Sequence, residues 1–164
     1  MSDFSVCFSW MMDNEDRGRK YKTVPDAPPG AQAISGINSA AFPDDFKKIN
    51  AIPQAKRGPA VQSFYRENFW NKWFDQIESD EVAKRVFDAA VNMGPGTAVK
   101  LLQEAAGCPV DGLWGPDTLA AVNAEGDALI DVFKQERSAH YQDIVLNDPE
   151  DAPYLGAWLA RANA

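Results

Sequence analysis

Glu15 is the residue best placed to do chemistry, because it ends an apolar helical stretch and precedes a segment rich in glycine and proline. A carboxylic acid there can act as a general acid, since the apolar helix disfavours its charged form and the irregular segment can supply the other wall of a cleft. Many glutamates at helix ends are simply solvated, so position alone leaves both interpretations open. Two further candidates follow in the irregular segment. Asp26 is a second carboxylate or a turn residue beside Pro25, and Ser35 is a hydroxyl able to hold a catalytic water molecule.

Three aromatic side chains and one amide are candidates for binding a substrate ring such as that of a sugar, because aromatic rings stack on such faces and amides form hydrogen bonds with polar groups. They are Tyr21, Tyr65, Trp70 and Asn92. Each has an alternative role in the core, and packing is the stronger interpretation for Trp70. Asp88 and Asn92 are four residues apart on an expected helix, so we expect them to share one face. Asn92 is equally suited to bonding a buried backbone group.

The elements that must position these residues are mostly helical. Apolar residues at helical spacing predict a helix over residues 3–14, followed by an irregular region over 17–43 with a short strand at 21–24. Caps, prolines and apolar spacing then predict further helices at 59–73, 80–93, 99–106, 116–122, 129–144 and 155–159, with a break at Gly94-Pro95-Gly96. The fold class is therefore mainly α with a small hairpin or irregular region after the first helix. A length of 164 residues fits a single domain, 1–164.

Composition excludes several classes of function. A net charge of −8 argues against nucleic-acid binding, which needs a basic face. Four basic residues at positions 17–22 are either a solvated turn or a patch facing an anionic polymer. No apolar run approaches the roughly 18–20 residues of a membrane span, so we expect no membrane insertion. With a single histidine, His140, and only two cysteines, we expect no metal and no cofactor.

Several ordered motifs, distributed over nearly the whole chain, resemble those of glycoside hydrolase family 108, a bacterial and phage lysozyme family. Asn14-Glu15-Asp16-Arg17-Gly18 stands where that family has a Glu-Gly-Gly-Tyr type motif. The other matching motifs are Pro28-Pro29-Gly30, Ser35-Gly36-Ile37-Asn38, Tyr65 to Trp70, Phe87 to Gly96, Val110 to Leu119, and Gly156 to Arg161. The chain departs from the family pattern near the expected active site. Asp16 and Arg17 replace the two glycines after the glutamate, and Ala27 replaces an aspartate.

The resemblance implies a lysozyme-like fold, with a catalytic helix, hairpin and cleft in residues 1–76 and a peptidoglycan-binding-like region in 77–164. It implies cleavage of the β-1,4 bond between N-acetylmuramic acid and N-acetylglucosamine, with Glu15 as the general acid and peptidoglycan as the partner of a monomer. The alternative is a non-catalytic peptidoglycan-binding or virion-associated protein that keeps the fold. Because the N-terminus does not read as a secretory signal, we expect synthesis in the cytoplasm. An endolysin of this kind would reach the cell wall through a holin-like pore.

Overall fold

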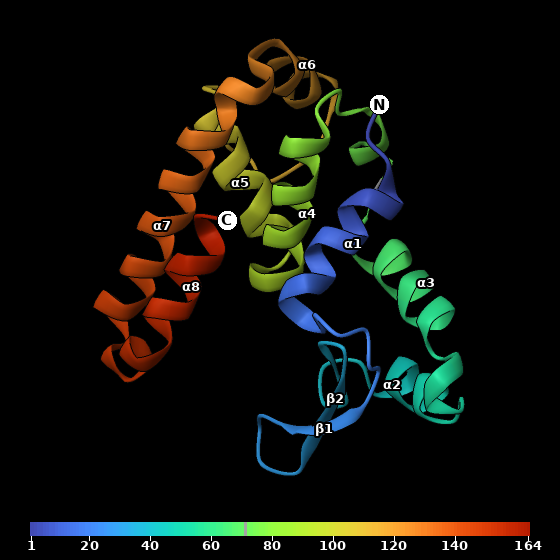
Figure 1. The fold of residues 1–164 in the computed structure, drawn as a ribbon. Helices are drawn as coiled ribbons and strands as arrows, with labels where there is room; N and C mark the ends of the chain where they lie inside the picture. Colours follow the sequence, from blue (N-terminus) through green and yellow to red (C-terminus); the bar gives the residue numbers. More distant parts are fainter. Residues whose placement is uncertain (71) are drawn as a thin grey trace. The chain divides into compact units, whose positions relative to one another are not determined.

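The computed structural model describes residues 1–70 and 72–164, and it is mainly helical with a small antiparallel sheet, as predicted (Figure 1). The chain forms two compact units. The N-terminal unit comprises residues 4–71, and the C-terminal unit comprises residues 1–3 together with 72–164. No helix in the described residues is both long and apolar enough to cross a membrane.

The N-terminal unit consists of helices around a three-stranded hairpin sheet of order β1-β2-β3. In chain order its elements are α1 (Phe4–Glu15), β1 (Thr23–Asp26), β2 (Ala31–Ile34), β3 (Ile37–Asn38), α2 (Pro43–Asn50), the short 3-10 helix η1 (Gln54–Lys56) and α3 (Gly58–Asn68). The first helix confirms the prediction. The predicted strand at 21–24 is displaced by two residues, because Tyr21 has a φ of 50° and cannot continue an extended strand.

The helix predicted over 59–73 is too long at its C-terminal end. α3 ends at Asn68, and Phe69 leaves the helical conformation with a φ of −126°. Phe69 then packs against Phe64 and Tyr65, and Trp70 packs edge-on against Phe4 at 5.3 Å between ring centroids. The end of this helix thus coincides with aromatic packing of Phe69 on α3 itself and of Trp70 on α1, contacts that helical periodicity in the sequence does not reveal.

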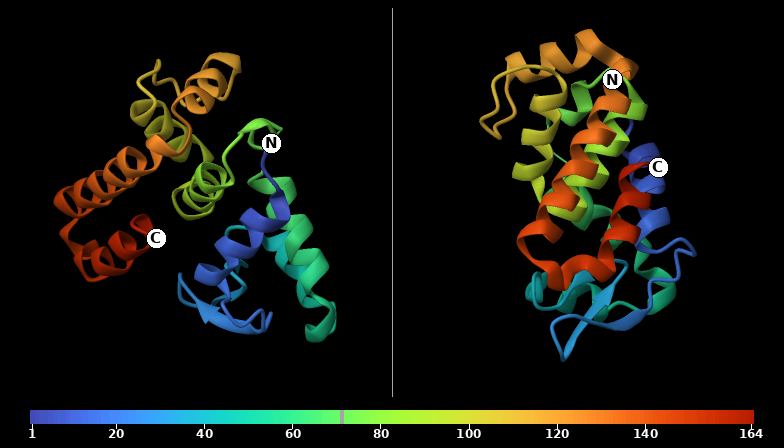
Figure 2. Two further views of the ribbon diagram at one scale, coloured as in Figure 1. Left: turned by 45° about the horizontal axis from the view of Figure 1, so that its top comes forward. Right: turned by 90° about the vertical axis from the view of Figure 1, so that its left-hand side faces the viewer.

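The C-terminal unit is a set of helices joined by short 3-10 turns. Its elements are η2 (Phe74–Gln76), α4 (Asp80–Met93), α5 (Pro95–Ala105), α6 (Pro116–Glu125), η3 (Gly126–Ala128), α7 (Leu129–Asn147), η4 (Pro149–Tyr154) and α8 (Leu155–Ala162). The predicted helix starts are confirmed at the Ser79 cap, whose hydroxyl accepts the Val82 amide, and at Pro116. α5 begins at Pro95, inside the Gly94-Pro95-Gly96 segment where the sequence predicts a break. Within this unit, α7 and α8 run side by side (Figure 2).

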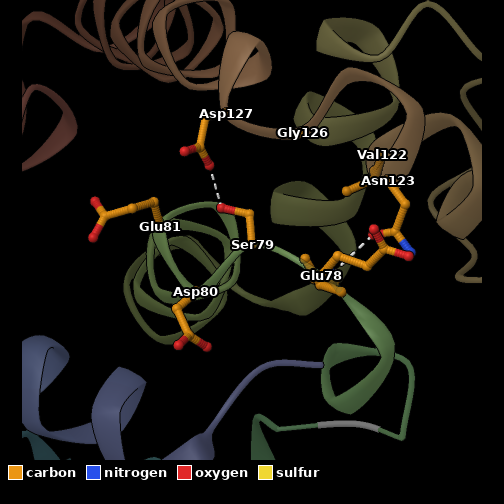
Figure 3. Close-up of a pocket in the computed structure, with 9 residues that line it drawn as sticks. Glu78, Ser79, Asp80, Glu81, Val122, Asn123, Gly126 and Asp127 are labelled. Atoms are coloured by element: carbon orange, nitrogen blue, oxygen red, sulfur yellow. Dashed lines mark hydrogen bonds between the residues drawn. The ribbon is translucent and has the colours of Figure 1, made fainter.

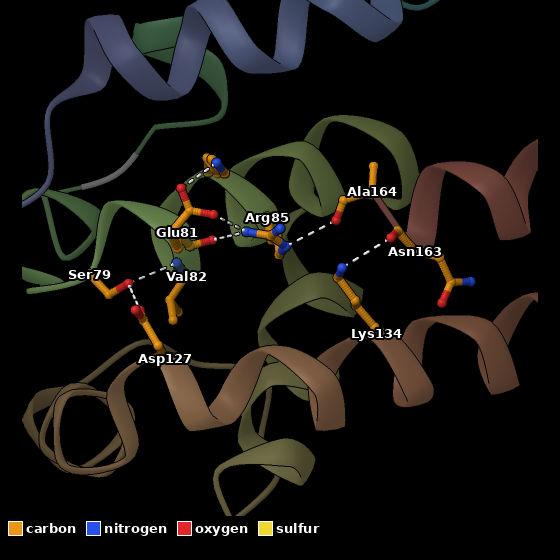
Figure 4. A network of polar contacts seen from close by, with 9 residues as sticks. Ser79, Glu81, Val82, Arg85, Asp127, Lys134, Asn163 and Ala164 are labelled. Atoms are coloured by element: carbon orange, nitrogen blue, oxygen red, sulfur yellow. Dashed lines mark hydrogen bonds and ion pairs between the residues drawn. The ribbon is translucent and has the colours of Figure 1, made fainter.

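Both ends of the chain are tied into the C-terminal unit. At the start, the Ser2 hydroxyl donates to the Ile77 carbonyl at 2.7 Å, and the Asp3 amide donates to the Asp80 carboxylate at 2.9 Å. At the end, the Ala164 carbonyl accepts from Arg85 at 3.2 Å, in the polar network of Figure 4. Residues near both ends of the sequence therefore form hydrogen bonds within this unit.

Candidate active site

Glu15 is the last residue of α1, and its side chain is partly buried. The preceding turn of the helix supplies the apolar wall that the sequence predicts, because Met11 and Met12 are fully buried. The Asp16 amide still bonds to the Met12 carbonyl at 2.8 Å, so the helical hydrogen bonding runs past Glu15. The backbone that carries the carboxylate is therefore held by the helix and not by the loop that follows.

The turn between β2 and β3 closes against this carboxylate. Ser35 and Gly36 both have positive φ values, 48° and 81°, as a two-residue type I′ hairpin turn requires. A Cβ atom added to Gly36 would collide with the Glu15 carboxylate and would lie 2.7 Å from the Tyr65 hydroxyl oxygen. Only glycine fits here, because the turn needs the positive φ and the Glu15 and Tyr65 oxygens occupy the space of a side chain.

Tyr65 fixes the same turn from α3. Its side chain is buried, with 1% exposed, and its hydroxyl donates to the Ser35 carbonyl at 2.7 Å. The structure therefore brings together three of the residues predicted from the sequence, Glu15, Ser35 and Tyr65, around one turn. Tyr65 contributes its hydroxyl to this cluster while its ring packs against Phe8 and Phe64.

Asp16, which the sequence marks only as a departure from the family pattern, organises the loop beside Glu15. Its carboxylate accepts the Lys20 amide at 3.0 Å, the Tyr21 amide at 2.7 Å and the Ser35 hydroxyl at 2.8 Å. Burial acts to raise the pKa of Asp16. The hydrogen bonds and the nearby Arg19 charge outweigh burial, so the pKa lies below its ordinary value. A fixed negative charge therefore links the end of α1 to the hairpin turn.

Asp26 lies at the other end of the hairpin from this turn. It pairs with Ala31 in the strand register, whereas Thr23 pairs with Ile34 next to the turn, a separation of about 10 Å along the strand. Its carboxylate accepts the Ala27 amide at 2.9 Å and the Asn38 side-chain amide at 2.8 Å. These bonds correspond to the turn role that the sequence left open, and the structure does not bring Asp26 to the Glu15 cluster.

Tyr21 is held near the start of α3 by a buried arginine. Its ring lies against Gly58, and its carbonyl accepts Arg57 at 2.9 Å. Arg57 is only 7% exposed and makes four more hydrogen bonds, to Thr23, to Ile52 and to the carbonyl and side chain of Asn50. Sequence reasoning missed Arg57, because the oxygens that it binds come from separate segments.

The two remaining predicted sugar-binding residues take part in packing and in hydrogen bonding. Trp70 is 6% exposed, as the packing interpretation predicts. Asn92 belongs to the C-terminal unit, where its side-chain oxygen accepts the Tyr141 hydroxyl. Asp88 shares this face of α4, as predicted, and bonds to Arg137 at 2.9 Å. Asn92 therefore belongs to a partly buried polar contact between α4 and α7.

Comparison with known protein families shows to which family the chain belongs. Residues 10–94 match the family model described as "Glycosyl hydrolase 108". The chain belongs to this family. Residues 97–163 match a second model, described as "Predicted Peptidoglycan domain". No curated protein sequence matches the chain.

A solved structure agrees with this assignment. "Structure of Brucella abortus SagA" matches with a TM-score of 0.67 and 25% sequence identity, over 97% of this chain and 92% of that one. The family model and the peptidoglycan model together support a glycoside hydrolase that acts on peptidoglycan in general. The matched range 10–94 contains the whole cluster of Glu15, Ser35, Gly36 and Tyr65.

This glycosyl hydrolase 108 chain also has an acidic hollow of about 420 Å³ where α4 begins beside the end of α6 (Figure 3). Four carboxylates line it, from Glu78, Asp80, Glu81 and Asp127. Hydrogen bonds from Lys84 and Arg85 hold the pKa of Glu81 below its ordinary value, and Asp127 accepts the hydroxyl of the capping Ser79. Among the described residues, no group of three or more acidic, histidine or cysteine side chains is arranged to hold a metal ion. The contacts in this hollow are therefore the capping and charge contacts that stabilise the start of α4.

Proposed function

We propose that the protein is a muramidase that cleaves the β-1,4 bond between N-acetylmuramic acid and N-acetylglucosamine, with Glu15 as its general acid. One observation carries the proposal. In a glycosyl hydrolase 108 chain, the Glu15 carboxylate ends an apolar helix and lies against Gly36, at a turn with no room for a side chain. A carboxylic acid held by a rigid helix beside a fixed turn suits the delivery of a proton to one defined oxygen.

In the proposed reaction, Glu15 donates its proton to the glycosidic oxygen as the bond to the anomeric carbon breaks. The transition state has oxocarbenium character, and water finally supplies the hydroxyl group of the new reducing end. The remaining proton of that water returns to the Glu15 carboxylate. Ser35 donates its own proton to Asp16, so the lone pairs of its oxygen are the groups left to orient a water molecule.

The test compares the wild type with Glu15→Gln on purified sacculi. Glutamine keeps the size of the side chain but cannot donate the acid proton, so we expect a loss of about a hundredfold to ten-thousandfold. Turbidity gives the rate, and mass spectrometry of the released fragments identifies the bond. Fragments with reducing muramic acid ends support the proposal, whereas reducing glucosamine ends would contradict the bond assigned.

Glu67→Gln is the matched control, because Glu67 is an exposed glutamate on α3 of the same unit. We expect this variant to keep the wild-type rate. If wild type and both variants bind sacculi and none cuts, the protein is the non-catalytic binding protein of the alternative.

The resemblance to bacterial and phage lysozymes supports an endolysin as the biological form of this activity. We expect the protein to lyse cells whose membrane has been opened and to leave intact producing cells unlysed. Lysis of intact producing cells without a pore-forming partner would contradict this part of the proposal.

A further inference from the structure

The loop between α5 and α6 is held in one conformation by a single buried side chain. Gln103 is 1% exposed and makes five hydrogen bonds to the residues that follow α5. Its oxygen accepts the amides of Asp111 and Gly112, and its nitrogen donates to the Asp111 carboxylate, the Leu113 carbonyl and the Thr118 hydroxyl. A loop fixed in this way loses little conformational entropy when it binds a partner.

This rigid loop presents apolar side chains to solvent. Leu113 is 70% exposed and Val110 is 46% exposed, and Pro109 and Pro116 are exposed on either side of them. Leu113 contributes little to the core, because most of its surface stays in water, and nearly half of the surface of Val110 does so as well. Exposed apolar groups that cluster on a preorganised loop are typical of a binding surface.

A small pocket of about 160 Å³ lies beside these side chains, and two carboxylates line it, those of Asp111 and Asp117. Hydrogen bonds from the Leu113 amide and from Gln103 hold the pKa of Asp111 below its ordinary value, so this group is charged at neutral pH. Both bonds go to one oxygen of Asp111. Lys100 packs its carbon chain against Gly112, and among the described residues no ion pair joins it to either carboxylate. The pocket is therefore apolar and negatively charged.

We propose that this loop binds the stem peptide of peptidoglycan. The Val110 and Leu113 side chains would contact the methyl groups of its alanines, and the Asp111 and Asp117 carboxylates would bind the ammonium group of its diamino acid. The inference rests on peptidoglycan as the substrate of the proposed function. It assigns the peptide, and not the glycan, to this surface, because its exposed side chains are aliphatic or acidic, whereas sugar rings commonly stack on exposed aromatic faces. The one aromatic ring in the pocket, Trp114, packs edge-on against Phe74, and its indole N–H is buried.

The experiment measures binding of the full chain to sacculi by co-sedimentation, with Glu15→Gln present in every protein to prevent cleavage. We expect Leu113→Asp to weaken binding about tenfold, since it replaces an apolar contact with the alanine methyl groups by a hydrated, polar side chain. Leu146→Asp is the matched control, because Leu146 is 79% exposed on α7 of the same unit, and it should bind as the parent protein does. Equal losses in the two variants would overturn the proposal.

A second comparison changes the ligand. An amidase that removes the stem peptides also removes the cross-links and gives soluble glycan strands, so these strands are immobilised on beads for the binding measurement. They should bind the parent protein about tenfold more weakly than sacculi do, and Leu113→Asp should then have no further effect. Acetylation of the diamino acid should weaken binding of the parent protein, and it should weaken binding of Asp117→Asn by a smaller factor, because that variant keeps one of the two carboxylates. If stripped glycan binds as well as intact sacculi, the inference fails even where the wild type cuts. If binding follows the stem peptide and the wild type does not cut, the muramidase proposal fails and the inference stands.

Discussion

Each unit contains one loop that a single polar side chain holds in place, and the two loops differ in what they enclose. In the N-terminal unit, Asp16 accepts two backbone amides and the Ser35 hydroxyl, and the turn that it fixes closes on Glu15. In the C-terminal unit, Gln103 bonds to both amides and carbonyls, and its loop directs Leu113 to solvent. The first loop suits chemistry on an enclosed group, and the second suits binding at a surface.

The largest expected effect comes from filling the enclosed loop. Gly36→Ala should lower activity about a hundredfold, because the new methyl group displaces the Glu15 carboxylate. We expect unfolding free energy to fall by about 1–3 kcal/mol through strain at this positive φ. Rates on sacculi and chemical denaturation measure the two effects.

Gly30→Ala is the control, because Gly30 has a φ of 91° but nothing within 4 Å of an added Cβ atom. It should lose only about 1–2 kcal/mol through backbone strain and keep its activity. Equal loss of activity in both variants would show that the contact with Glu15 is unimportant.

The next effect concerns the open loop. Gln103→Leu should lower the free energy of unfolding by about 2–3 kcal/mol, because buried amides and carbonyls lose their partner. Amide hydrogen exchange at Asp111 and Gly112 should become faster. The exposed neighbour Glu104→Gln serves as control, and unchanged exchange in Gln103→Leu would mean that the loop is held by other contacts.

Replacing the charged group should have a smaller effect that depends on pH. Asp16→Asn should lower the free energy of unfolding by about 1 kcal/mol at pH 7, since the side-chain amide cannot accept all three bonds. Because the folded pKa of Asp16 is lowered, its charge stabilises the wild type above the unfolded pKa. That contribution is lost as the pH falls through the folded pKa. Denaturation at pH 7 and below pH 3 should therefore show the difference between wild type and variant shrinking.

Double-mutant cycles with Ser35→Ala test whether this effect acts through the turn. We expect coupling between Asp16 and Ser35 in kcat and little change in KM, because the turn positions Glu15. Additive effects on kcat would contradict a positioning role for Asp16.

The smallest effect should follow from Asp26→Asn at the other end of the hairpin. Its carboxylate bonds to its own turn and to Asn38, so we expect activity within about twofold of the wild type. Steady-state rates on sacculi check this. A loss above a hundredfold would instead identify Asp26 as the second catalytic carboxylate.

Local signals in the sequence predict much of the fold and less of the site. The helix starts at Ser79 and Pro116 follow from capping chemistry that acts within a few residues. The roles of Asp16 and Arg57 in the site cannot be predicted from such local signals, because their hydrogen-bond partners are up to 19 and 36 residues away in the sequence. The two-residue turn at Ser35 and Gly36 likewise depends on Tyr65 from α3.

The N-terminal unit is an insertion in the other unit, because residues 1–3 fold with residues 72–164. A proteolytic cut near residue 72 would break the one covalent link between the inserted segment and residues 72–164, and the hydrogen bonds of Ser2 and Asp3 would then be its remaining attachment through residues 1–3. A gene fragment that begins at residue 72 would lack Ser2 and Asp3, whose bonds to Ile77 and Asp80 secure the entry into α4. A tag that displaces the first residues should therefore loosen a helix start about eighty positions further along the chain.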